Sequence, residues 1–225
     1  MIVLETENVI KQFRQYDNVV TAVNRVSLSV EEGEFIAITG ESGSGKSSLL
    51  HIAAGLDTPN AGTVELLGKD LSRMKPDDLC RFRGKHTGFV FQSYRLVPYL
   101  TALENILLPI SAAGKEREQV EHRLQLLVER LALTDRLSHL PSELSGGQQQ
   151  RVAIARALIH HPMVLFADEP TGNLDPTTAE NVTNLLLSLR DELKQTLVIV
   201  THDQRLAARA DRAYRMVDGE LYVNR

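Results

Sequence analysis

The sequence predicts an α/β fold in which a mostly parallel sheet is covered by helices, with antiparallel strands near the N-terminus and an inserted helical segment. Three observations predict it. Short apolar runs typical of buried strands recur along the chain, helix-like stretches lie between them, and apolar alternation marks the N-terminal region. With 225 residues, 43% of them apolar, the chain is long enough to bury a core without disulfides, and Cys80 is its only cysteine.

The N-terminal part predicts antiparallel strands followed by one strand–loop–helix unit. The apolar pattern at 3–9 and the alternation at 26–30 predict strands with one buried face. Residues 35–39 form a short apolar run that predicts a fully buried strand. We expect a helix at 47–54 and a further short strand at 89–91.

From about residue 100 to 160 the apolar pattern changes from strand to helix. Apolar residues spaced four, three and four apart predict an amphipathic helix: Val120, Leu124, Leu127 and Leu131. Residues 146–160 predict a second helix. We interpret this block as an insertion, so that a single domain has a core lobe of about 1–94 and 161–225 and a helical lobe of about 95–160.

The C-terminal part returns to strand character. Residues 163–167 and 197–201 predict two more buried strands, and residues 178–194 predict the helix between them. Asp218-Gly219 lies between two short strand-like runs and is a two-residue turn signal, which predicts a hairpin at the end of the chain. Strands that alternate with helices imply parallel pairing.

Composition and charge disfavour several classes of protein. Lys and Arg total 25 and Asp and Glu total 29, and the net charge of −4 disfavours nucleic-acid coat proteins and polybasic membrane anchors. With 5% aromatic residues and no Trp, a base-stacking surface is also disfavoured. The sequence contains no secretory signal and no apolar run of roughly 18 residues. We therefore expect a soluble chain that reaches a membrane only through a partner.

A glycine-rich segment follows the predicted strand at 35–39 and matches the phosphate-binding pattern G-x-x-x-x-G-K-[ST] of P-loop NTPases. Glycines let backbone N–H groups converge on an anion, and the N-terminus of the following helix adds partial positive charge. Lys46 supplies a full charge to the outer phosphates, and the hydroxyl of Ser47 is a ligand for Mg²⁺. The predicted ATP-binding residues are Gly40, Glu41, Ser42, Gly43, Ser44, Gly45, Lys46, Ser47 and Ser48.

Two carboxylates follow the predicted strand at 163–167, namely Asp168 and Glu169. In open parallel sheets, sites form at the carboxyl ends of strands, so both should lie near the phosphate loop. P-loop enzymes give one such Asp to the Mg²⁺ shell. We therefore assign Asp168 to the metal and Glu169 to the attacking water as general base.

A second anion-binding pattern lies within the helical block, where Ser145, Gly146, Gly147 and Gln148 precede or open a helix. Ser145 is a favourable N-cap residue, and a glycine-rich helix N-terminus attracts anions. A simple glycine-kinked helix start is the alternative. Because the chain has one lysine-bearing loop, we expect this second site to close over the nucleotide of another copy, in a head-to-tail dimer around two ATP molecules.

The order of these motifs resembles that of the ATP-binding-cassette (ABC) ATPases over nearly the whole chain. The matching segments are the phosphate loop at 40–47, Gln92, LSGGQ at 144–148, LFADEP at 165–170, NLD at 173–175 and THD at 201–203. TGNLD at 171–175 and the segment 91–106 are most similar to the cassettes of lipoprotein-releasing and macrolide-export systems. The resemblance implies a P-loop NTPase fold and ATP hydrolysis.

The resemblance also implies roles for individual residues. Gln92 would join Ser47 and Asp168 around Mg²⁺ and sense the attacking water. His202 would contact the γ-phosphate and hold the water and Glu169 in register. Asp175 would link the two active sites of the dimer. Many family members stack adenine on a Tyr before the phosphate loop, and here Phe13 or Tyr16 takes that place, although Phe13 could instead belong to the core.

The resemblance implies a partner for the dimer, an integral membrane permease with a large periplasmic domain, at the cytoplasmic face of the cell membrane. ATP would close the dimer and hydrolysis would open it, which drives export of a lipoprotein or another amphiphile. The alternative is a cassette that transmits force or a signal without transport. DNA-maintenance ATPases need long coiled coils and translation factors need two cassettes, and neither feature occurs here, so we expect no nucleic-acid partner.

The segment 92–110 is the predicted surface for the membrane partner. It is unusually apolar for a loop, with Leu96, Val97, Leu100 and Leu103. These residues could equally pack within the helical lobe.

Overall fold

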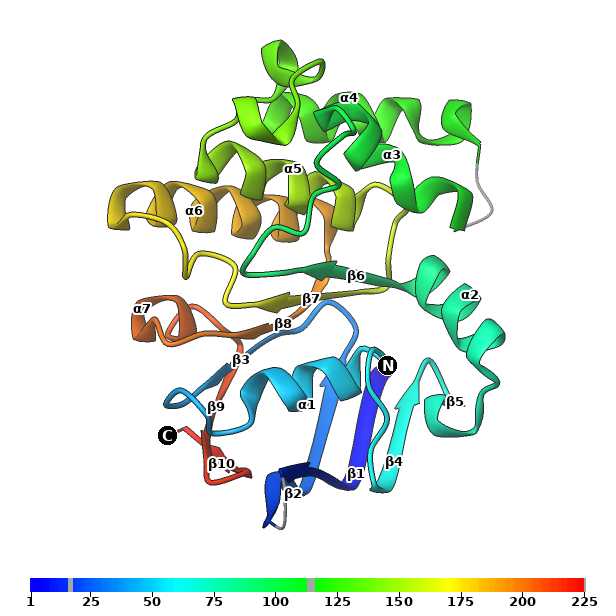
Figure 1. Ribbon diagram of the computed structural model, residues 1–225, viewed down its shortest axis with the longest axis vertical. Coiled ribbons are helices and arrows are strands. Elements are labelled where there is room, and N and C mark those ends of the chain that lie inside the picture. Colours follow the sequence, from blue (N-terminus) through cyan, green and yellow to red (C-terminus); the bar gives the residue numbers. More distant parts are fainter. Residues whose placement is uncertain (16–17, 113–115, 225) are drawn as a thin grey trace. The chain divides into compact units, whose positions relative to one another are not determined.

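The computed structural model describes residues 1–15, 18–112 and 116–224. The chain divides into two compact units, the first made of Met1–Cys80 and Thr196–Arg225 and the second of Arg81–Gln195. Helix α2 (Pro76–His86) carries the chain from the first unit into the second. Figure 1 labels the elements of both units.

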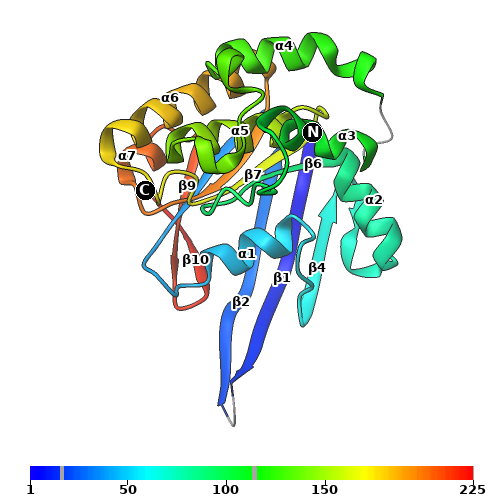
Figure 2. The same ribbon diagram turned by 45° about the horizontal axis from the view of Figure 1, so that its top comes forward.

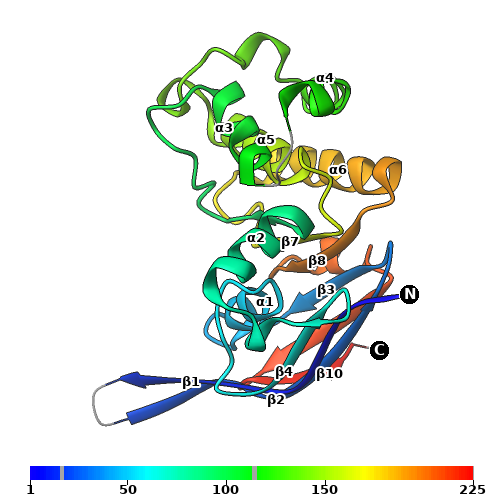
Figure 3. The ribbon, with the colours of Figure 1, turned by 90° about the vertical axis from the view of Figure 1, so that its right-hand side faces the viewer.

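An antiparallel sheet in the order β2-β1-β4-β5 forms part of the first unit. Its strands are β1 (Ile2–Gln15), β2 (Asn18–Glu31), β4 (Ala61–Leu66) and β5 (Lys69–Asp70). The pairing of β1 with β4 covers residues 4–10, whereas its pairing with β2 continues to the far end of both strands. A two-stranded ribbon therefore extends from this sheet, as Figures 2 and 3 show. Val26, Leu28 and Val30 are buried, which confirms the predicted alternation.

A mixed set of strands forms the other part of the first unit, in the order β10-β9-β3-β8, with β10 antiparallel to β9 and the other pairs parallel. Their bounds are β3 (Phe35–Thr39), β8 (Thr196–Val200), β9 (Arg212–Val217) and β10 (Glu220–Val223). Strand β3 is buried throughout and pairs in parallel with both β8 and β9, so the carboxyl ends of these three strands share one edge. Helix α1 (Lys46–Ala53) follows β3 and contacts β8 and the antiparallel sheet. The short helix α7 (Gln204–Ala207) follows β8.

The second unit is mainly helical and contains one parallel strand pair. Its elements are β6 (Thr87–Val90), β7 (Val164–Asp168), α3 (Ala102–Ala112), α4 (Glu121–Arg130), α5 (Gly146–Leu158) and α6 (Pro176–Leu193). Helix α5 contacts α3, α4, α6 and β6, which makes it the central element of this unit (Figure 1). Short 3-10 helices complete its connections, at Arg117–Val120, Thr134–Arg136 and Pro141–Glu143, and another lies in the first unit at Leu71–Arg73.

The structure confirms most of the predicted elements and corrects their edges. The strand expected at 89–91 is β6, which ends one residue earlier and begins at Thr87. The closing hairpin has Asp218 and Gly219 at its turn, with φ angles of +47° and +81°. Such angles suit a two-residue hairpin turn, so the turn signal is confirmed.

Helix α3 forms the second part of the segment 92–110, which the sequence marks as unusually apolar for a loop. The helix begins at Ala102 and continues through Pro109. A proline inside a helix removes one backbone hydrogen bond. Here Ala102, Ile106 and Ile110 are buried at a spacing of four, and burial of this face stabilises the helix despite the proline. In the part of the chain that the structure describes, no helix is long and apolar enough to cross a membrane.

Candidate functional site

The phosphate loop connects β3 to α1 in a shape that only glycine can adopt at two positions. Gly45, the N-cap of α1, has a φ of +102°, and a Cβ atom there would lie 1.9 Å from the carbonyl oxygen of Ala22. A Cβ atom on Gly40 would lie 2.4 Å from the carbonyl oxygen of Met216. Backbone packs directly against both glycines, which fixes the course of the loop.

Lys46 is buried and folds back along the phosphate loop. Its ammonium group donates hydrogen bonds to the carbonyl oxygens of Gly40 at 2.8 Å and Glu41 at 2.7 Å. An ammonium group has three donors, and these bonds use two of them. The loop thus holds a full positive charge against its own backbone.

The loop also contains a polar group that suits an anionic ligand. The hydroxyl oxygen of Ser44 is buried and has no hydrogen-bond partner among the described residues. A buried hydroxyl without a partner is costly, so a phosphate oxygen within its reach would satisfy it. This donor, together with the charge of Lys46, fits the phosphates of a nucleotide.

His202, the second residue after β8, lines a pocket together with the start of the phosphate loop. The pocket has a volume of about 510 Å³. It is lined by His202, by residues 39–41 and by Gln204, Arg215 and Asn224. Arg215 adds a second cation to this edge of the parallel strands. Sequence reasoning missed Arg215, because nothing in the pattern of β9 marks it.

In the second unit, β7 ends at Asp168 and Glu169 follows at once. Glu169 has a φ of +45°, a left-handed conformation that is rare for a residue with a side chain. Its carbonyl oxygen accepts a hydrogen bond of 3.0 Å from the N–H of Gly172. Strained backbone of this kind is concentrated at functional sites, where surrounding contacts hold it in place.

Gln92 is exposed and is held by the segment that follows Glu169. Its side-chain amide donates to the side-chain oxygen of Asn173 at 3.2 Å, and the Asn173 amide donates to the Gln92 carbonyl at 3.0 Å. A Cβ atom on Gly172 would lie 2.8 Å from the Gln92 amide nitrogen. The structure thus brings Gln92 together with the segment after Glu169.

Ser145 caps α5, as the sequence predicts. Its hydroxyl accepts a hydrogen bond of 3.3 Å from the N–H of Gln148, and the Gln148 side chain accepts one of 2.9 Å from the N–H of Ser145. This reciprocal capping box fixes the start of the helix at Gly146.

Asp175 is the N-cap residue of α6. Its carboxylate accepts a hydrogen bond of 3.1 Å from the N–H of Thr178. Hydrogen bonds from Thr178 lower the pKa of this carboxyl group, so Asp175 is ionised at neutral pH. In the single chain, the Asp175 side chain therefore caps the N-terminus of α6.

Phe13, the candidate adenine contact, lies on the ribbon of β1 and β2. Its side chain is 44% exposed and pairs across the ribbon with Val20. The ammonium nitrogen of Lys11 lies 5.2 Å from the centre of the Phe13 ring. Such exposure argues against a place in the core and leaves a ring face within reach of a ligand. Tyr16, the other candidate, lies outside the described residues.

The candidate residues are distributed over both units. The phosphate loop, Phe13 and His202 belong to the first, and Gln92, Asp168, Glu169, Asp175 and residues 145–148 to the second. Within the described ranges, no group of three His, Cys, Asp or Glu side chains could hold a metal ion. Mg²⁺ commonly takes one or two carboxylates with hydroxyl, water and phosphate oxygens, so the donor types of Ser47, Gln92 and Asp168 suit it.

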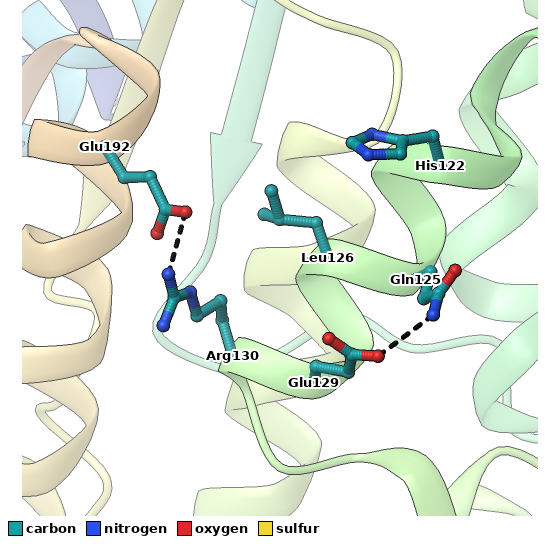
Figure 4. A pocket seen from close by; sticks show the side chains of 6 residues that line it. All are labelled: His122, Gln125, Leu126, Glu129, Arg130 and Glu192. Carbon is teal, nitrogen blue, oxygen red and sulfur yellow. Dashed lines mark hydrogen bonds and ion pairs between the residues drawn. The ribbon is translucent and has the colours of Figure 1, made fainter.

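A hollow of about 460 Å³ in the second unit contains none of these residues. His122, Gln125, Leu126, Glu129, Arg130 and Glu192 line it (Figure 4). The Arg130 guanidinium and the Glu192 carboxylate form an ion pair of 3.0 Å that connects α4 to α6. Gln125 donates to Glu129 within α4. The Arg130–Glu192 pair thus links two helices of the unit.

Comparisons with known proteins agree with the geometry. The ABC transporter family profile matches residues 23–172. The chain is 48% identical over 219 residues to an uncharacterised ABC transporter ATP-binding protein, YbbA, of Escherichia coli K12, covering 97% of this chain and 96% of that one. It is 50% identical over 196 residues to the lipoprotein-releasing system ATP-binding protein LolD of Bacteroides thetaiotaomicron, covering 87% and 90%.

Two solved structures of the bacterial ABC transporter cassette MJ0796 are also similar. Its dimeric structure matches with a TM-score of 0.89 and 40% identity, covering 99% of this chain and 97% of that one. A second dimeric structure, in a post-hydrolysis state with bound ADP and phosphate, matches with the same TM-score and 39% identity. The chain therefore belongs to the ABC transporter family, as an ATP-binding cassette that hydrolyses ATP.

Proposed function

We propose that this chain is the ATPase subunit of a membrane transporter, pairing with a second copy around two ATP molecules to drive an integral membrane partner. The observation that carries the proposal is its likeness to LolD over most of both chains. By this analogy the partner is a permease with a large periplasmic domain, and export of a lipoprotein or another amphiphile is the favoured activity. The cassette would then work at the cytoplasmic face of the cell membrane, as one ABC ATPase domain with the core lobe and helical lobe expected above.

In this proposal, one set of residues binds the phosphates of ATP and another activates the attacking water. Residues 40–48 bind the phosphates of ATP, and Lys46 neutralises their outer charge. Mg²⁺ would supply further neutralisation of the phosphate oxygens, with Ser47, Gln92 and Asp168 as its protein ligands. Glu169 accepts the proton of the attacking water, and His202 holds the γ-phosphate. These assignments rest on the motifs and on the family.

The dimer follows from the capped N-terminus of α5. Residues 145–148 present backbone N–H groups and a helix dipole, which attract phosphate. In the proposed pair they would contact the nucleotide that the partner's phosphate loop holds, and Asp175 would lie between the two sites. The dimeric structures of MJ0796, which are about 40% identical, support this arrangement.

The membrane partner is proposed to dock on the loop before α3. Tyr99 is 79% exposed there, and Leu96, Val97 and Leu100 are half-buried in the same loop. The amide of Asn105, a fully buried residue of α3, donates to the carbonyl oxygens of Val97, Leu100 and Thr101, and its oxygen accepts from the Val97 N–H.

Tyr99→Glu should weaken capture of the membrane partner about tenfold or more, because it places a charge where an aromatic anchor is expected. Capture from detergent-solubilised membranes, quantified against ATPase activity of the isolated chain, tests this. Tyr222→Glu is the matched control, since Tyr222 is an exposed tyrosine of β10. Equal capture by Tyr99→Glu and the unchanged chain contradicts the docking surface. A membrane partner whose complex moves no amphiphile would favour the alternative function, transmission of force or a signal.

Phe13→Ala should weaken ATP binding about fivefold or more, because base–aromatic stacking contributes ~1–3 kcal/mol. Titration with ATP and with a ribose triphosphate that lacks the base measures the effect. Phe13→Tyr, which keeps the ring, should bind ATP as the unchanged chain does. If Phe13→Ala binds ATP with unchanged affinity, Phe13 has no role in adenine binding.

A further inference from the structure

Two consecutive residues after Gln92 have left-handed backbone conformations, Tyr94 with a φ of +58° and Arg95 with a φ of +49°. Neither is a glycine, and such pairs are disfavoured unless neighbouring groups hold them. The N–H groups of Tyr94 and Arg95 donate to carbonyl oxygens within the loop, those of Phe91 and Ser93, and a further restraint comes from outside the loop.

Arg156, near the C-terminal end of α5, provides that restraint. Its guanidinium donates two hydrogen bonds of 2.6 Å, one to the carbonyl oxygen of Tyr94 and one to that of Arg95. The planar fork of a guanidinium matches two adjacent acceptors, which a lysine cannot match. Burial lowers the pKa of Arg156 to about 10, so the group remains charged at neutral pH. The Arg95 guanidinium in turn lies 4.3 Å from the centre of the Phe91 ring.

The Tyr94 side chain approaches the same helix at its other end. A Cβ atom on Gly146 would lie 2.9 Å from the Tyr94 hydroxyl oxygen, 3.3 Å from the Cδ2 methyl of Leu174 and 3.8 Å from the Tyr94 ring carbon that carries the hydroxyl. Gly146 and Arg156 are ten residues apart, or about 15 Å along a helix. Tyr94 therefore lies against α5 at two separate points: its backbone carbonyl accepts from Arg156, and its hydroxyl lies near Gly146 at the N-terminus of the helix.

We propose that Tyr94 is a positioning residue for ATP hydrolysis. Arg156 fixes the backbone of Tyr94 to α5, and the Tyr94 hydroxyl sets how closely the loop after Gln92 approaches Gly146. A shift of the α5 N-terminus would then move Tyr94 and, two residues away, Gln92. The inference rests on the proposed function, in which residues 145–148 contact the partner's nucleotide.

A double-mutant cycle on the full-length chain tests the contact. Gly146→Ala should lower the kcat for ATP hydrolysis about fivefold or more, an effect of the size typical for residues in contact. The affinity of a single chain for ATP should change little. Tyr94→Phe removes only the hydroxyl. The kcat of the double variant Tyr94→Phe/Gly146→Ala should therefore be less than about twofold lower than the kcat of Tyr94→Phe alone. Circular dichroism melting of each variant separates loss of folding from loss of turnover.

Gly147→Ala is the matched control, because its clash involves a different residue. A Cβ atom on Gly147 would lie 2.5 Å from the Cγ2 methyl of Thr178. Tyr94→Phe should therefore not rescue Gly147→Ala, whereas Thr178→Ser, which removes the methyl group and keeps the hydroxyl, should do so. Equal rescue of both alanine variants by Tyr94→Phe would contradict a specific contact.

The outcomes separate this inference from the proposed function. Unchanged turnover in Gly146→Ala overturns both. Lost turnover that Tyr94→Phe does not restore overturns the role of Tyr94 and leaves the proposed role of residues 145–148 intact.

If Gly146→Ala fails to fold, Arg156→Lys decides the question. It should speed amide hydrogen exchange at residues 93–97 and lower kcat while the affinity for ATP is retained. Unchanged exchange and kcat would overturn the inference.

Discussion

Glu169→Gln is expected to lower ATP hydrolysis about a hundredfold or more, because a general base contributes 10²–10⁴-fold to such reactions. Glutamine has nearly the same shape, so the left-handed turn at Glu169 and its hydrogen bond to Gly172 should persist. The amide cannot accept the proton of the attacking water. ATP binding should therefore remain while turnover stops, and the proposed ATP-bound dimer should accumulate.

Phosphate release measures the loss of turnover, and gel filtration with ATP measures the dimer. Glu180→Gln is the matched control, because Glu180 is an exposed carboxylate of α6, and it should hydrolyse ATP at the unchanged rate. Full turnover in Glu169→Gln would remove Glu169 from the mechanism.

Lys46→Ala is expected to weaken ATP binding about tenfold to a hundredfold, because hydrogen bonds to charged groups contribute about 1.5–3 kcal/mol. The change also leaves the carbonyl oxygens of Gly40 and Glu41 without their donor. We therefore expect the nucleotide-free protein to melt at a lower temperature. Lys46→Met, which retains most of the side-chain volume, separates the charge from packing.

Equilibrium titration with ATP, paired with thermal melting, measures both effects. Lys75→Ala removes an exposed lysine of the first unit and should change neither quantity. Unchanged ATP affinity in Lys46→Ala and Lys46→Met would refute the assignment of the phosphate loop.

Structures that a short stretch of sequence determines by itself could be predicted. The strand at 35–39 is short, apolar up to Thr39 and fully buried, and the glycines after it fix the path of the backbone, so β3, the loop and α1 lie close to where the sequence predicts them. Asp218-Gly219 likewise admits a tight hairpin turn. The capping box of Ser145 follows from its hydroxyl and from Gln148 three residues later.

Elements that depend on tertiary contacts were missed. Helix α2 has Phe82 as its buried residue and otherwise a polar surface, so apolar periodicity gives little signal. Helix α3 contains Pro109, which argues locally against a helix, and only the burial of Ile106 and its neighbours offsets this. The left-handed pair after Gln92 is held by Arg156, which lies 62 and 61 residues later than Tyr94 and Arg95, and no local pattern records that contact.

The hydrogen bonds of Asn105 affect how strongly any partner can bind to the loop that carries Tyr99. Binding to a mobile loop loses free energy, because the segment must be ordered as the complex forms. Here one buried amide already fixes the backbone at Val97, Leu100 and Thr101. The conformational entropy is therefore lost when the chain folds, and a binding partner meets a rigid surface whose full contact energy contributes to affinity.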